Sequence, residues 1–138
     1  MSDNLLDSSR GKPKCISIII CNEIIEDKMT SNKTLVSLFN SIHMQSAPGS
    51  HPRMFLMASF ADGEGHWPIS VSIRSPHGKE LLRAEHVSVF VDPTAVLDIV
   101  MEVRGLPLES EGAYFVDVAV DNSVVAYRRF TVNISEMD

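Results

Sequence analysis

Residues 112–132 read GAYFVDVAVDNSVVAYRRFTV, and this stretch decides the fold. Apolar side chains recur at every second position, which predicts two strands, each with one face toward a core. Both apolar faces fall on even positions, so the strands can pair only if an odd number of residues connects them. We therefore predict a three-residue loop over 120–122, with Asn122 in the left-handed conformation that asparagine tolerates. The even positions are Tyr114, Val116, Val118 and Val120 in the first strand, and Val124, Ala126, Phe130 and Val132 in the second.

The residues at the start of this hairpin match the entry to a strand of a β-sandwich. Gly112 stands two positions before Tyr114, and Val116 stands two positions after it. This is the arrangement of a tyrosine corner, in which the phenol hydroxyl bonds back to the preceding backbone. Val116 occupies the place of the second cysteine of an antibody domain, so we expect a sandwich without that disulfide.

A second hairpin is expected around residues 75–78, which read SPHG. Pro76 at the second position and Gly78 at the fourth are the residues that a type I turn favours. Apolar residues alternate with polar ones on both sides of this turn, which predicts two half-buried strands. The alternating residues are Ile69, Val71 and Ile73 before the turn, and Val87, Val89 and Val91 after it.

The remaining segments also favour strands over helices. Residues 53–61 are apolar at both odd and even positions, which is typical of a central strand covered on both faces or of a crossing at the edge of a sandwich. Residues 34–43 and 94–104 fit either periodicity, and the β-branched content of 94–104 favours a strand there. No stretch has the length and capping residues of a long helix. We therefore predict an all-β protein with one antiparallel sandwich of about seven or eight strands over 14–134, a flexible polar leader over 1–13 and a short tail over 135–138.

Composition excludes several classes of function. The chain has 138 residues, with 12 Lys and Arg against 18 Asp and Glu, which gives a formal net charge of -6. A negative chain without a basic cluster does not suit nucleic-acid binding. No apolar run approaches the roughly 20 residues that span a bilayer. Since the N-terminus lacks the pattern of a secretory signal, we expect a cytoplasmic protein.

The two cysteines are expected to remain reduced. Cys15 and Cys21 are six residues apart, so on one extended strand they lie about 20 Å from each other. That separation forbids a disulfide between them.

Several segments between residues 15 and 133 carry a likeness to known proteins. They are CNEIIED (21–27), KTLVSLFNSI (33–42), SPHG (75–78), GLPL (105–108) and GAY (112–114). Together they resemble an uncharacterised family of small single-domain bacterial proteins, a domain of unknown function. The resemblance implies an immunoglobulin-like β-sandwich and a strand rather than a helix over 34–43. It implies no catalytic residue.

No motif in the sequence carries catalytic or metal chemistry. The five histidines, at positions 43, 51, 66, 77 and 86, do not have the spacing of a zinc site. The loop Asp62-Gly63-Glu64-Gly65 offers two carboxylates, whereas calcium takes six or more oxygen ligands. We expect no metal, no cofactor and no catalytic residues, and an enzyme of unidentified class is kept only as a minor alternative.

Four residues are candidates for contact with a ligand or partner. Trp67 either caps one end of the sandwich or serves as an exposed anchor. Together with His66 and Asp62 it would line a cleft among the end loops. Arg128 interrupts the apolar face of the last strand. Either its stem covers apolar surface while its head reaches water, or its guanidinium faces a ligand.

The function that these observations favour is a non-enzymatic interaction module. The edges of a β-sandwich expose unpaired backbone groups, which can pair with a strand of another protein or of a second copy. The alternative is a sandwich that binds a small ligand or carbohydrate through Trp67, His66 and Asp62.

Overall fold

The computed structural model describes residues 11–135, and within this range it contains nine strands and no helix. The strands are β1 (Lys14–Glu26), β2 (Lys33–Leu38), β3 (Ser41–Met44), β4 (Gly49–Ala61), β5 (Gly65–Arg74), β6 (Glu80–Phe90), β7 (Leu97–Leu108), β8 (Gly112–Val120) and β9 (Ser123–Ile134).

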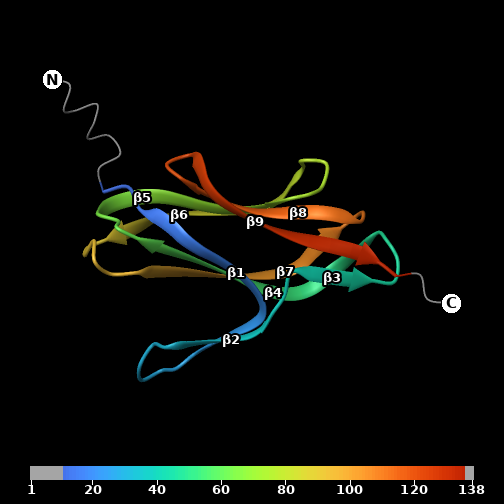
Figure 1. Ribbon diagram of the computed structural model, residues 1–138, viewed down its shortest axis with the longest axis horizontal. Coiled ribbons are helices and arrows are strands. Elements are labelled where there is room, and N and C mark those ends of the chain that lie inside the picture. The colour runs from blue at the N-terminus through green and yellow to red at the C-terminus, as the bar shows by residue number, and fades with distance from the viewer. Residues whose placement is uncertain (1–10, 136–138) are drawn as a thin grey trace.

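The strands form two sheets that pack face to face, as Figure 1 shows. Sheet A has the order β2-β1-β4-β7, and sheet B has the order β3-β9-β8-β5-β6. All neighbouring pairs are antiparallel except β3 and β9, which are parallel. The predicted all-β sandwich is confirmed. The predicted leader and tail lie mostly outside the described residues.

The strand count exceeds the predicted seven or eight because residues 34–43 form two short strands. β2 pairs with β1 in sheet A, whereas β3 pairs with β9 in sheet B. Phe39 and Asn40 carry the chain from one sheet to the other. The strand predicted over 94–104 is present as β7, which begins at Leu97.

The core lies between the two sheets and contains the tyrosine corner. Tyr114 is buried, and its hydroxyl donates a 2.7 Å hydrogen bond to the carbonyl of Ser110. Its ring stacks on that of Phe130 with 5.5 Å between centroids. This confirms the predicted corner. The largest fully buried side chains besides Tyr114 are Phe60, Phe130, Ile20, Met54, Leu56, Ile69, Ile73, Leu106 and Leu108.

The β1–β2 hairpin is the edge of sheet A and bends toward the outer face of that sheet. β1 leaves β4 after Cys21 and continues with β2 alone, and in Figure 1 this hairpin runs below sheet A. Lys33 on the hairpin lies 3.8 Å from Asp98 on β7. Phe55 and Met57 face away from the inter-sheet core, yet both are buried. The prediction that 53–61 is covered on both faces is therefore confirmed.

The last hairpin differs from the prediction in the length of its loop. Val120 pairs with Ser123, so the turn contains two residues, Asp121 and Asn122. Both have positive φ, 52° and 66°, which suits a type I′ turn. The ladder then shifts register beside Val118, where one extra residue in β9 restores the even-to-even pairing. Pairing even positions with even positions requires one extra residue between the two strands. That residue lies in a bulge of β9 and not in the loop.

Because the bulge lies between Val124 and the regular part of β9, Val124 is 63% exposed instead of facing the core as predicted. The left-handed conformation of Asn122 is confirmed.

The hairpin of β5 and β6 has the predicted turn, but the face of β6 that points to the core is the opposite of the predicted one. Gly78 N–H donates to the Ser75 carbonyl at 2.9 Å, which closes the turn that contains Pro76. The buried residues of β6 are Ser88 and Phe90, because the register places even positions of β6 beside the core-facing odd positions of β5. The prediction for the valines of this segment is therefore wrong. Val87, Val89 and Val91 are exposed by 60%, 49% and 86%.

Candidate functional site

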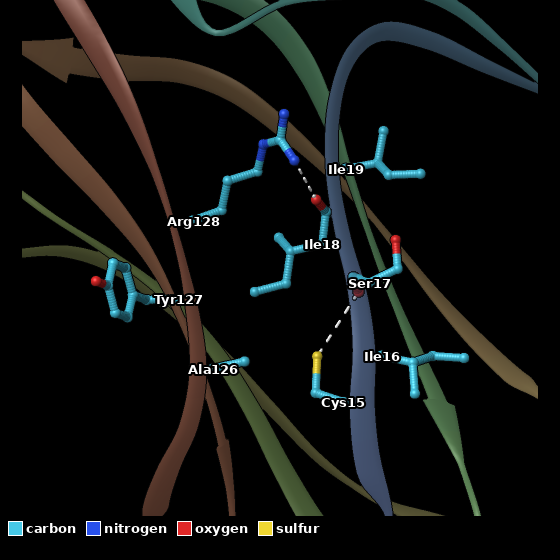
Figure 2. Close-up of a pocket in the computed structure, with 8 residues that line it drawn as sticks. All are labelled: Cys15, Ile16, Ser17, Ile18, Ile19, Ala126, Tyr127 and Arg128. Carbon is cyan, nitrogen blue, oxygen red and sulfur yellow. Dashed lines mark hydrogen bonds between the residues drawn. The ribbon is translucent and has the colours of Figure 1, made fainter.

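A trough opens on one side of the sandwich, between β1 of sheet A and β9 of sheet B. Its wider part has a volume of about 400 Å³. Figure 2 shows the two strands running past each other, with the Arg128 and Ile18 side chains between them. The residues that line this part are Cys15, Ile16, Ser17, Ile18, Ile19, Ala126, Tyr127 and Arg128.

The β1 side of the trough is an open strand edge. β1 pairs with β4 over Lys14–Cys21, but on its other side β2 reaches only as far as Cys21. The carbonyl of Ile20 accepts a bond from Phe39 N–H, and that of Ile18 accepts one from Arg128; both donors lie on the side away from β4. The N–H and C=O of one residue in an antiparallel strand face the same side. The N–H of Ile18 therefore points into the trough.

The β9 side is a second open edge. β3 pairs with β9 only from Thr131 onward, and Thr131 N–H donates to the Asn40 carbonyl at 2.9 Å on the side away from β8. Since the direction of backbone groups alternates along a strand, those of Tyr127 and Arg129 face the same side. Within residues 11–135, no strand pairs with them there. The trough thus continues the line that β3 occupies beside the end of β9.

Arg128 crosses the trough and joins the two sheets. Its Nη1 donates to the Ile18 carbonyl at 3.0 Å, and its Nη2 donates to Asn40 Oδ1 at 2.6 Å. Its Nε is buried and has no hydrogen-bond partner among residues 11–135. The guanidinium thus bonds to two protein acceptors, and its Nε–H is left as a buried donor without one.

The trough is locally basic in a chain of net charge -6. A second hollow of about 390 Å³ continues it past Cys15 and is lined by Lys12, Pro13, Lys14, Cys15 and Val125. None of the residues that line the two hollows is an acid, and three of them, Lys12, Lys14 and Arg128, are cations. Asp62 lies 3.7 Å from Lys14, with both side chains largely exposed. This contact is weak because water screens it.

The Cys15 thiol in the trough is poorly suited to nucleophilic catalysis. Burial raises its pKa, and the Sγ lies 3.6 Å from the Ser17 carbonyl. A thiol with a raised pKa stays protonated at neutral pH and is a weak nucleophile. Cys15 and Cys21 are both free, as predicted.

The structure does not bring Trp67, His66 and Asp62 together in one cleft. Trp67 is half-buried against the core, and its indole N–H donates to the Glu64 carbonyl at 2.7 Å. His66 precedes it on β5, so its side chain points to the opposite face of the sheet. Asp62 lies beside Lys14 at the start of β1.

Sequence reasoning identified Arg128 but missed its surroundings. Ile18 lies 110 positions from Arg128 in the chain, so no local pattern connects them. The alternation of apolar and polar residues along β1 and β9 indicates that both segments are strands. It does not indicate that both leave an edge open on the same side of the molecule.

Two further features bear on chemistry in residues 11–135. No group of three or more His, Cys, Asp or Glu side chains is placed to hold a metal ion. In the same range, no helix has the length and apolar character needed to cross a membrane.

Comparisons with known proteins agree with this architecture. A Pseudomonas fluorescens alkylpurine DNA glycosylase, AlkC, bound to DNA containing an abasic site analog, aligns with 94% of this chain at a TM-score of 0.51 and 12% identity. The alignment spans 33% of the glycosylase, so this chain matches about one third of that protein. At such identity the likeness concerns the fold alone.

An immunoglobulin-like protein from Pseudomonas aeruginosa aligns with 91% of this chain over its whole length, with a TM-score of 0.40 and 13% identity. A comparison with curated proteins finds no match. The model of one protein family, described as "Family of unknown function (DUF6941)", matches residues 16–133. That range covers most of the chain and nearly the whole β-sandwich, and the chain therefore belongs to this family of unknown function.

Proposed function

We propose that the protein is a non-enzymatic interaction module that binds an extended, acidic segment of a partner protein in the trough between β1 and β9. The observation that supports this most strongly is the pair of open edges at Ile18 and at Tyr127 and Arg129. An extended segment that pairs with one of these edges would add a strand to that sheet, as in other cases of strand addition.

The chemistry of the trough supports an acidic partner. Lys12 and Lys14 lie along one part of it and Arg128 along the other, so the positive charge of three side chains faces a segment bound there. Arg128 already gives the Ile18 carbonyl a hydrogen bond, so a segment that pairs with β1 at Ile18 must displace this guanidinium. Free Cys15 and Cys21 suit the reducing cytosol, which we propose as the location of the protein.

A displayed library of random eight-residue peptides tests this proposal. We expect the selected peptides to be rich in Asp and Glu, with β-branched residues at alternate positions. They should bind a Tyr127→Val variant as they bind the wild type, and should lose binding to Tyr127→Pro. Proline removes the N–H that faces the trough, while the ladder to β8 does not use that group.

Amide hydrogen exchange provides the readout that does not depend on proline being tolerated. Bound peptide should slow exchange at Ile18, Tyr127 and Arg129 in the wild-type chain. The proposal is overturned if no peptide is selected, or if the selected peptides protect amides elsewhere.

A further inference from the structure

β6 is an unprotected edge of sheet B, at the far end of the sheet from β9. It spans Glu80–Phe90, and among the strands of residues 11–135 it pairs only with β5. β7, the corresponding edge of sheet A, contains Pro107 and a left-handed Gly105 with φ 63°. Such features blunt an edge against pairing. β6 contains no proline or positive φ, and after the bulge at Leu81 its ladder to β5 is regular from Leu82 to Phe90; β2 and β3 are much shorter.

The backbone of β6 presents its odd-numbered residues to the open side. The carbonyl of Pro68 accepts a bond from Asp121 N–H, so it faces β8 and not β6. Pro68 is paired with Val87, and that pair is therefore not hydrogen-bonded between β5 and β6. The N–H and C=O of Val87 point outward, as do those of Arg83, Glu85 and Val89 two and four residues away.

Two copies of β6 can pair antiparallel only with odd residues opposite odd residues, because those residues carry the outward groups. The charge pattern then separates the possible registers. Centring the pair on Glu85 or on Arg83 places like charges opposite each other, and centring it on His86 places both charges opposite valines. Only the register centred on Ala84 places Arg83 of each copy opposite Glu85 of the other.

That register overlaps most of β6 and places Val87 opposite Leu81, which lies at a bulge near the start of β6 and packs against the core. Val87 is 60% exposed, so pairing would cover apolar surface that the single chain leaves open. Arg83 already contacts Glu85 of its own strand at 2.9 Å, so the pair would assemble a ring of four alternating charges.

We infer that this protein forms a symmetric dimer by antiparallel pairing of β6 with β6, in the register that sets Arg83 against Glu85. The two copies would share a continuous ten-stranded sheet, twice the five strands of sheet B. Because β6 and β9 lie toward opposite ends of sheet B in each copy, the dimer leaves the trough of each copy open.

Charge reversal at these two positions tests the register. Arg83→Glu and Glu85→Arg should each weaken self-association about tenfold, because each replaces two attractive cross-strand pairs by repulsive ones. A mixture of the two single variants should associate, since every facing pair is then again opposite in charge. The double variant should dimerise like the wild type for the same reason.

Sedimentation equilibrium of the full chain over a wide concentration series measures these effects. Circular dichroism should show all variants folded, because both side chains are exposed. Val87→Pro should abolish the dimer by removing an outward N–H, and Val87→Thr is its control. The inference is overturned if the wild type stays monomeric throughout, if the single variants dimerise as tightly as the wild type, or if their mixture does not associate.

Discussion

Arg128 on β9 donates a 3.0 Å hydrogen bond from Nη1 to the Ile18 carbonyl on β1, and this contact joins the two sheets where no strand does. The same guanidinium reaches Asn40 on the segment that crosses between the sheets. One half-buried side chain therefore links the two sheets on the side of the sandwich where the trough lies.

Replacing Arg128 by methionine should lower the free energy of unfolding by about 1–2 kcal/mol. The apolar stem is kept, but the Ile18 carbonyl loses a charged donor. Equilibrium urea denaturation measures the loss. Arg128→Lys keeps the charge and one donor group, so it should lose less. Equal stability of the wild type and both variants would show that the bridge contributes nothing.

Removing the hydroxyl of the tyrosine corner should have a similar cost. Tyr114→Phe keeps the stacked ring but leaves the Ser110 carbonyl without its 2.7 Å partner, and we expect a loss of about 1–2 kcal/mol in thermal or urea unfolding. Tyr127→Phe is the matched control, because Tyr127 is 65% exposed and should tolerate the same change. Equal effects at the two positions would contradict the corner's structural role.

Glycine and alanine at position 122, in the two-residue turn between β8 and β9, should differ in their effect on stability. Asn122 has a φ of 66°, a region that costs an alanine about 1–2 kcal/mol. Asn122→Ala should therefore unfold at lower urea than Asn122→Gly, which should match or exceed the wild type. If alanine and glycine gave the same midpoint, the left-handed conformation would not be present in solution.

The thiols should make the fold sensitive to alkaline pH. Burial raises the pKa of both Cys15 and Cys21 above that of an unfolded thiol, which is about 8.5. The folded chain then holds these protons more tightly than the unfolded chain, so this contribution to stability is complete below about pH 8.5 and is lost as the pH rises through the folded pKa values.

Urea midpoints between neutral and alkaline pH measure this loss. The wild type should lose stability more steeply than a variant carrying Cys15→Ala and Cys21→Ala, whose other titrating groups are unchanged. Parallel slopes for the two chains would rule out the thiols as the cause.

The sequence predicts which segments are strands better than it predicts which face of a strand is inside. Alternation along 87–91 correctly indicates a strand, but Val87 and Val89 point to solvent, and Phe90 packs inside against Phe60 with ring centroids 6.3 Å apart. Alternation shows that apolar residues recur at every second position. It does not show which face of the strand points to the core, because that depends on the register with β5. The same limit applies to Val124, because a bulge in β9 turns its side chain away from the core.

The candidate site was harder to predict than the fold for a different reason. Arg128 stands out locally as a charge on an apolar face, and that signal correctly separated it from its neighbours. Its acceptors on β1 and at Asn40 are distant in sequence. Trp67, His66 and Asp62 are close in sequence, yet the alternation of β5 directs His66 and Trp67 to opposite faces.

The hairpin of β1 and β2 has a consequence for how this molecule can meet others. Phe55 and Met57 on the outer face of sheet A are buried, and the hairpin bends toward that face, where Lys33 contacts Asp98. The chain itself therefore occupies part of the surface on which a foreign sheet would otherwise stack. Face-to-face stacking of sheets between chains is thus hindered on that side. Hydrogen bonding along strand edges is a mode of assembly that the hairpin does not obstruct.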